Sequence, residues 1–159
     1  MKAREIMVPV TLYLKPEHEI KDFIMMLRTH REQDRTSSSK SLPVLNENGK
    51  LSGIVSIRDI LKAIYPSYFS LADLSLFTWD GMLETLAKEA SGKKISEIMN
   101  PPASAVKEDD PLMECVDHIL RYSISTLPVV DSDGRLKGML YESDIFFTVA
   151  EAIAGKNRE

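Results

Sequence analysis

The fold is decided by the stretch SLPVLNENGKLSGIVSIRDIL, residues Ser41–Leu61. A second stretch of the same design follows at Thr126–Phe146 and reads TLPVVDSDGRLKGMLYESDIF. Leu-Pro-Val, two glycines and an Asp-Ile pair recur at one offset of 85 residues (127 − 42 and 144 − 59). A constant offset across several motifs indicates an internal duplication.

Each copy predicts a β-hairpin that continues into a helix. Apolar strand-like segments flank a turn rich in Asn, Asp and Gly, which is the sequence pattern of a hairpin. In the first copy we expect strands at Leu42–Leu45 and Leu51–Ile57, then a helix from Ser56 to about Pro66. In the second copy we expect a hairpin over Leu127–Tyr141 and a helix over Ser143–Ala154.

A further helix precedes each hairpin. Its apolar residues recur at the i, i+3, i+4, i+7 spacing of one buried face. In the first repeat these are Ile20, Phe23, Ile24 and Leu27, with Pro16 in the first turn and an end near His30. In the second they are Leu112, Cys115, Val116 and Ile119, after an Asp110 cap and a first-turn Pro111. Residues 6 to 14 predict a loop that enters a short edge strand, where Pro9 is tolerated.

The order of elements gives an α/β (α+β) fold with two repeats of strand, helix, strand, strand and helix. We expect the first repeat at residues 1–66, a helical connector at 67–93, the second repeat at 94–155 and a charged tail at 156–159. In the connector, a helix near residues 79–87 is expected to bury Met82, Leu83, Leu86 and Ala90. Ile-Met recurs at an offset of 92 residues (98 − 6), so the first repeat carries seven extra residues (92 − 85), which fall in its serine-rich loop.

Composition indicates a soluble globular protein rather than a membrane or nucleic-acid-binding one. The 159 residues are 43% hydrophobic and 28% charged, and the net charge is −4. No apolar run approaches the ~20 residues that cross a bilayer, and a mixed, slightly acidic surface does not favour phosphate binding along nucleic acid. The absence of an N-terminal signal core and the single Cys115 suit the cytoplasm. We read Cys115 as a core residue.

The two copies resemble cystathionine-β-synthase (CBS) domains, which occur as tandem pairs called Bateman modules. The resemblance rests on Ile-Met-x-Pro at Ile6–Pro9 and Ile98–Pro101, on the Leu-Pro-Val hairpin, and on Gly-h-h-[Ser/Thr]-x-x-Asp, where h is apolar. It covers nearly the whole chain apart from residues 67–93 and the tail. It implies two β-α-β-β-α repeats packed head to tail about a pseudo-twofold axis.

The resemblance also implies two clefts for adenosine-containing ligands. Each cleft would combine the Ser/Thr and Asp of one repeat with the Ile-Met-x-Pro and Leu-Pro-Val neighbourhoods of the other. The first would be formed by Ser56, Arg58, Asp59, Met99, Pro102, Ser104, Ile124 and Ser125. The second would be formed by Met7, Val10, Leu12, Lys40 and Asp144. Tyr141 stands where the second motif requires Ser or Thr, so the first cleft is expected to bind better.

These residue types suit a nucleotide. A carboxylate such as Asp59 accepts charge-assisted hydrogen bonds from both hydroxyls of a ribose diol. A helix start attracts phosphate through its free N–H groups, to which Ser56 adds a hydroxyl and Arg58 a charge. Apolar Met99, Pro102 and Ile124 could sandwich the flat adenine.

Two of these assignments have simpler alternatives. Ser-x-x-Asp is also close to a capping box, in which Ser56 and Asp59 close the helix N-terminus on each other. The serine-rich segment that holds Arg31, Arg35 and Lys40 is either a solvated loop or a source of phosphate contacts. The sequence leaves both alternatives open.

Catalysis has little support in the sequence. We find no Ser-His-Asp or Cys-His set, phosphate-binding glycine loop or carboxylate pair, and His18, His30 and His118 lack metal-ligand spacing. We therefore expect a non-enzymatic sensor of AMP, ADP, ATP or S-adenosylmethionine that reports to an effector protein. The alternatives are a ligand-free interaction scaffold and, third, a nucleotide-processing enzyme.

We also expect a homodimer. Met25 and Met26 widen the apolar face of the first helix, and Phe146, Phe147, Val149 and Ile153 widen that of the last. A monomer rarely exposes apolar patches beyond a few hundred Å². The alternative cover for these faces is the 67–93 connector of the same chain.

Overall fold

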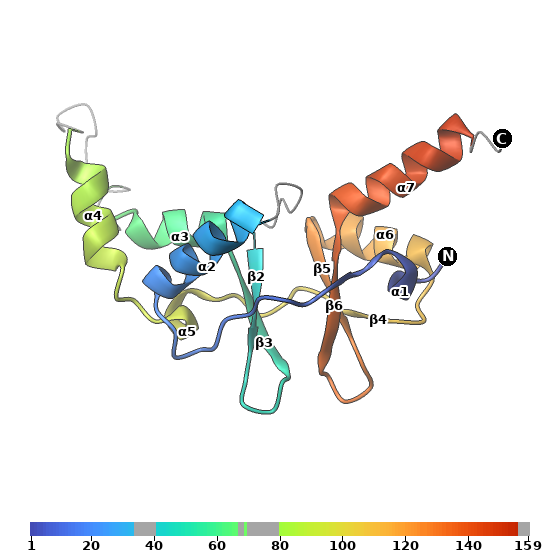
Figure 1. Ribbon diagram of the computed structural model, residues 1–159, viewed down its shortest axis with the longest axis horizontal. Coiled ribbons are helices and arrows are strands. Elements are labelled where there is room, and N and C mark those ends of the chain that lie inside the picture. Colours follow the sequence, from blue (N-terminus) through green and yellow to red (C-terminus); the bar gives the residue numbers. More distant parts are fainter. Residues whose placement is uncertain (34–40, 67–68, 70–79, 156–159) are drawn as a thin grey trace. The chain divides into compact units, whose positions relative to one another are not determined.

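The duplicated stretch folds twice into a β-hairpin that runs directly into a helix (Figure 1). The computed structural model describes residues 1–33, 41–66, 69 and 80–155. The first copy forms β2 (Ser41–Leu45), β3 (Leu51–Ser56) and α3 (Ile57–Ile64). The second forms β5 (Thr126–Val130), β6 (Leu136–Tyr141) and α7 (Glu142–Ala154). The predicted hairpins and the helices that follow them are confirmed.

The hairpin turns explain the first glycine of each copy. Gly49 has a φ of 74° and Gly134 a φ of 83°, in the left-handed region that side chains disfavour. In the second turn, Asp131 accepts hydrogen bonds from the N–H groups of Arg135 and Asp133. The Arg135 bond is the main reason that the pKa of this carboxyl lies below its ordinary value.

The N-terminal segment completes the sheet of the second copy. It forms α1 (Ala3–Ile6) and β1 (Val8–Pro9), and β1 pairs antiparallel with β6, Val8 opposite Met139 and Pro9 opposite Gly138. Because β1 is the edge of the order β1-β6-β5-β4, the missing N–H of Pro9 costs no internal bond. The predicted edge strand is confirmed, whereas α1 was not expected.

The chain forms two compact units that interleave the sequence repeats. Unit 1 contains Met1–Thr11, Glu47–Leu51 and Pro102–Glu159, and unit 2 contains Leu12–Asn46 and Ser52–Pro101. The leading segment of each repeat therefore packs with the hairpin of the other. The compact units thus differ from the contiguous repeats, 1–66 and 94–155, that the sequence predicts.

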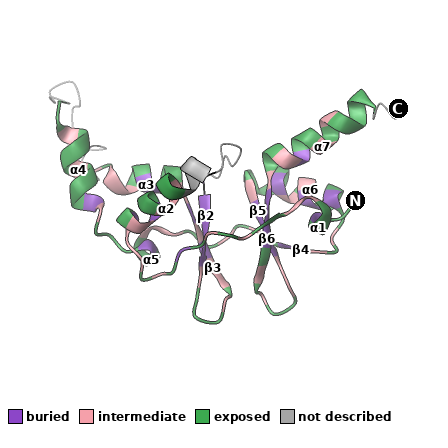
Figure 2. Ribbon diagram, viewed as in Figure 1, coloured by how far each residue is buried: buried purple, intermediate pink, exposed green. Residues whose placement is uncertain are grey.

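Unit 1 is a four-stranded sheet with α6 (Leu112–Tyr122) and α7 among its helices. The short β4 (Val106–Lys107) lies parallel to β5 at the edge opposite β1. Figure 2 shows the burial of β5 and β6 at the centre of this unit. Cys115 is fully buried in its core, and burial is the main cause that raises the pKa of its thiol to about 11. The core interpretation of Cys115 is confirmed.

Unit 2 repeats this arrangement around β2 and β3. Isolated bridges take the place of the two edge strands, Leu14 parallel to Val44 and Asn100 antiparallel to Ile54. The helices are α2 (Ile20–Gln33), α3, α4 (Met82–Ala90) and α5 (Ile95–Ile98). Its core contains the buried residues Leu14, Ile20, Phe23, Leu42, Val44, Val55, Ile60, Ala90 and Ile95.

Two helix starts differ from the sequence prediction. The α2 helix begins at Ile20 and not at Pro16, because the carbonyl groups of Pro16 and His18 accept hydrogen bonds from Ser96 and Ile95. Pro111 is the N-cap of α6 and not its first helical residue. The carboxylate of Asp110, which was expected to cap that helix, accepts a hydrogen bond from the N–H of Lys107 instead.

Two predicted core positions are exposed within the described structure. Ile24 is 40% exposed, although its neighbours Ile20 and Phe23 are buried. Leu83 is 63% exposed, and only Ala90 of the four predicted connector positions is fully buried. Both errors have the same cause. Helical spacing predicts which face of a helix is apolar, but it does not predict how much of that face other elements cover. The residues 67–68 and 70–79 of the predicted connector lie outside the described residues.

Candidate functional site

The first repeat closes the start of α3 with a capping box between Ser56 and Asp59. The N–H and hydroxyl of Ser56 donate to Oδ2 of Asp59 at 2.8 and 2.9 Å. The N–H of Asp59 donates to the Ser56 Oγ at 3.2 Å. The structure therefore confirms that Ser56 and Asp59 form the capping box of the alternative interpretation. The capping box also fixes the Asp59 carboxylate in one orientation. Asp59 is only half-buried, so capping leaves it accessible to a ligand.

The segment after α5 crosses this helix start. The backbone of Asn100 exchanges two hydrogen bonds with Ile54 of β3, at 2.9 and 3.1 Å. Its side-chain amide donates to Oδ1 of Asp59 at 2.9 Å. Residues of both sequence repeats therefore meet at one carboxylate within unit 2. The ligand cleft that the sequence predicts from Asp59 and the Ile-Met-x-Pro segment of the other repeat stays a prediction.

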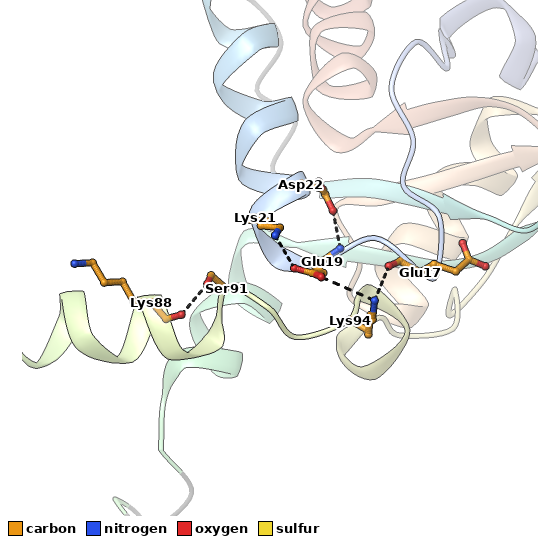
Figure 3. A network of polar contacts seen from close by, with 7 residues as sticks. All are labelled: Glu17, Glu19, Lys21, Asp22, Lys88, Ser91 and Lys94. Atoms are coloured by element: carbon orange, nitrogen blue, oxygen red, sulfur yellow. Dashed lines mark hydrogen bonds and ion pairs between the residues drawn. The ribbon is translucent and has the colours of Figure 1, made fainter.

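The α5 helix delivers this segment because it is docked on the start of α2. The N–H groups of Ile95 and Ser96 donate to the carbonyls of His18 and Pro16, at 2.7 and 3.0 Å. Around them, the Lys94 ammonium lies 3.4 Å from the carbonyl oxygen of Glu17 and 3.9 Å from the carboxylate of Glu19 (Figure 3). Exposed ion pairs add little stability, so the two backbone hydrogen bonds and the fully buried Ile95 side chain are the main contacts that hold α5 here.

The second glycine of each hairpin makes room for the crossing segment. A Cβ on Gly53 would lie 2.9 Å from the Asn100 carbonyl oxygen and 3.1 Å from the Met99 sulfur. A Cβ on Gly138 would lie 2.9 Å from the Met7 sulfur and 3.0 Å from the Val8 carbonyl oxygen. The two Ile-Met-x-Pro segments therefore run against their hairpins in the same way.

The second repeat presents Asp144 without a capping box. Asp144 is half-buried in the first turn of α7, and Tyr141 occupies the N-cap without a side-chain capping bond. Among the described residues, none donates a hydrogen bond to the Asp144 carboxylate. The substitution of Tyr for Ser therefore leaves Asp144 less fixed than Asp59.

The predicted site residues as a whole are divided between the two units. Unit 1 holds Met7, Val10, Pro102, Ser104, Ile124, Ser125 and Asp144. Unit 2 holds Leu12, Ser56, Arg58, Asp59 and Met99. Lys40 lies outside the described residues. The structure thus brings Ser56, Asp59 and Met99 into one unit, and Asp144 and Met7 into the other.

Two polar side chains at these positions were not predicted from sequence. Asn100 occupies the variable position of the Ile-Met-x-Pro motif. The motif therefore did not predict that Asn100 would form a hydrogen bond with Asp59. His118 places its Nδ1 at 2.5 Å from the Ser104 hydroxyl, across 14 residues of sequence. The sequence held one signal for the Asn100 contact: the variable position of the motif is a polar Asn in the second repeat and an apolar Val8 in the first. No sequence pattern indicated that His118 contacts Ser104.

The family of the chain follows from comparison with known proteins. The model of the CBS domain matches residues 3–66 and 95–151, the two repeats described above. The chain belongs to the CBS domain family. The recognition made from the duplicated motifs is therefore correct, and so is the mixed α/β fold of two repeats. The head-to-tail arrangement of the repeats stays a prediction.

Relatives of this CBS pair include small and large proteins. It is 31% identical to the protein MJ1426 of Methanocaldococcus jannaschii, over 89% of this chain and 90% of the relative. It is 32% identical to the CBS domain-containing chloroplastic protein CBSX2 of Arabidopsis thaliana, over 65% of this chain but only 47% of that protein. The match to the magnesium transporter MgtE of Thermus thermophilus is 24% identical, over 91% of this chain and only 26% of the transporter.

Within the described part of this CBS pair, no helix has the length and apolar character that a bilayer span needs.

Solved structures with the same fold include complexes with adenosine compounds. The crystal structure of CBSX2 with AMP superposes with a TM-score of 0.68 at 23% identity, covering 96% of this chain and 98% of that one. The CBS pair of MJ0100, solved with 5′-methylthioadenosine and S-adenosyl-L-methionine, superposes with a TM-score of 0.67 at 22% identity, with the same coverage. At these identities the likeness establishes the fold of this CBS pair.

Proposed function

We propose that this CBS pair is a non-enzymatic regulatory sensor that binds an adenosine-containing ligand and signals to an effector protein. The expected ligands are AMP, ADP, ATP and S-adenosylmethionine. The expected compartment is the cytoplasm, where the single buried thiol of Cys115 stays reduced. The solved relatives that hold AMP, or S-adenosylmethionine with 5′-methylthioadenosine, support this ligand class.

The observation that carries the proposal is the geometry of Asp59. Its carboxylate sits at the first turn of α3, is held by Ser56, and remains accessible. An oriented carboxylate recognises the cis-diol of a ribose through charge-assisted hydrogen bonds. The exposed Arg58 on the same turn supplies positive charge for a phosphate.

Signalling would follow from a shift in populations. A ligand that contacts residues of both repeats favours the arrangement in which those contacts form. An effector with different affinities for the two arrangements then senses ligand occupancy, and by linkage its own binding changes ligand affinity by the same factor.

A thermal-shift screen tests the function against its rivals. We expect AMP, ADP, ATP, NAD or S-adenosylmethionine to raise the melting temperature, because ligand at 100 times Kd adds about 2.7 kcal/mol of stability. A ligand-free scaffold predicts no shift with any of them. Chromatography of the nucleotide after overnight incubation separates the sensor from an enzyme, since only an enzyme would convert it.

We also expect the chain to form a homodimer through exposed apolar helix faces. On α7, Phe146 and Phe147 are 62% and 63% exposed and Ile153 is 82% exposed. On α2, Met25 is 60% exposed. Light scattering at micromolar concentration should give twice the 17.9 kDa chain mass, and Phe147→Glu should shift the mass toward the monomer. A monomer mass for the wild type, with and without nucleotide, would contradict the dimer and favour the connector as the cover.

A further inference from the structure

The acceptor capacity of Asp59 is nearly used within the free chain. An ionised carboxylate offers about four acceptor positions on its two oxygens. Two are taken at Oδ2 by the N–H and hydroxyl of Ser56, and one is taken at Oδ1 by the Asn100 amide. A ribose diol presents two hydroxyl donors, so one free position does not accommodate both.

The second repeat lacks the equivalent of the Asn100 contact. Asn100 lies opposite Ile54 in the bridge to β3, and Val8 lies opposite Met139 in the ladder to β6. Ile54 and Met139 are equivalent positions of the duplication (139 − 54 = 85), so Val8 is the structural counterpart of Asn100. The Val side chain has no donor, and within the described structure the Asp144 carboxylate receives no hydrogen bond. The two repeats therefore differ in whether their own chain occupies the carboxylate.

We propose that Asn100 sets ligand affinity at the Asp59 site by competing for Oδ1. This inference rests on the proposed function, because the competitor is a ribose hydroxyl. Ligand entry requires the Asn100 amide to release Oδ1, while Ser56 keeps its two bonds and holds the carboxylate in place. Asn100 is exposed, so its amide can turn to water when it is released. The site then opens without movement of the backbone that pairs Asn100 with Ile54.

Calorimetric titration with AMP tests the competition. The Asp144→Ala background isolates the Asp59 site, and Asn100→Val copies the residue that the second repeat uses at this position. We expect Asn100→Val to tighten AMP binding by up to about tenfold, the equivalent of one hydrogen bond. Asn100→Ala gives a second variant without a donor. In the Asp59→Ala background, Val8→Asn should weaken AMP binding at Asp144, because it installs the competing amide there.

NMR of the wild-type chain provides a readout without substitution. The side-chain amide signals of Asn100 should shift on saturation with AMP, whereas a purely structural bond would leave them in place. Unchanged or weaker AMP affinity in both folded Asn100 variants would overturn the inference while leaving the sensor function intact. If AMP binds neither the wild-type chain nor Asn100→Val, the sensor function fails for AMP and the inference fails with it.

Discussion

Asp59→Ala is expected to weaken binding of an adenosine ligand by about 1.5–3 kcal/mol, or roughly ten- to 150-fold. The loss is that of a hydrogen bond to a charged group, which is worth more than a neutral one. Asp59 is the N3 residue of the capping box, so the same substitution also removes the acceptor for the Ser56 N–H, and stability should fall by about 0.5–1.5 kcal/mol, the net value of one hydrogen bond. Calorimetry with AMP and thermal unfolding of the ligand-free variant measure the two effects separately.

Two controls separate ligand binding from helix capping. Ser56→Ala removes the cap but keeps the carboxylate, so it should cost stability with a smaller loss of affinity than Asp59→Ala. Asp144→Ala should cost less affinity than Asp59→Ala, because Tyr141 replaces the hydroxyl residue of the motif in that repeat. Unchanged affinity in Asp59→Ala with a large loss in Asp144→Ala would reverse this ranking. Lost stability without any change in affinity would leave Asp59 as a capping residue alone.

Alanine at Gly53 or Gly138 is expected to destabilise the chain by about 1–3 kcal/mol, the usual cost of overpacking. The new Cβ on Gly53 would meet the Asn100 carbonyl oxygen at 2.9 Å, and that oxygen is fixed by its hydrogen bond with Ile54. On Gly138 the nearest atom is the Met7 sulfur, also at 2.9 Å. Met7 has a flexible side chain, but the Val8 carbonyl at 3.0 Å does not yield easily.

Gly92→Ala is the matched control for this pair. Its Cβ would meet only the Glu19 carboxylate, at an ordinary 3.9 Å, and its backbone is not left-handed. Denaturant unfolding should therefore place Gly92→Ala near the wild type, with Gly53→Ala and Gly138→Ala clearly below it. Equal midpoints for all three variants would show that the Ile-Met-x-Pro segments are not held tightly against the hairpins.

The elements that could be predicted from sequence are those with local signals. The hairpins carry turn glycines and paired apolar strands, and the duplication shows each pattern twice. The α7 helix begins at Glu142, one residue from its predicted start, because it follows directly from the return strand. The capping box was likewise visible, because Ser56 and Asp59 lie three residues apart.

The elements that escaped prediction depend on contacts between distant segments. The α1 and α5 helices have only four residues each, too few for any periodicity to be seen. They are defined by docking, as when Ile95 bonds to the carbonyl of His18. Asn100 donates a hydrogen bond to Asp59, 41 residues away in the sequence, and no local sequence pattern near either residue predicts this bond. The start of α2 was predicted too early for the same reason. The carbonyls of Pro16 and His18, which precede α2, accept hydrogen bonds from α5.

The most direct test of the sensor function is a calorimetric titration of AMP into the wild-type chain and into the Asp59→Ala, Asp144→Ala double variant. The wild type should give a saturable isotherm, because at least one oriented carboxylate receives the ribose. The folded double variant should bind at least about tenfold more weakly, since both carboxylates are gone. Superimposable isotherms from the two proteins, or no AMP binding to the wild type, would contradict the assignment of these carboxylates to nucleotide recognition.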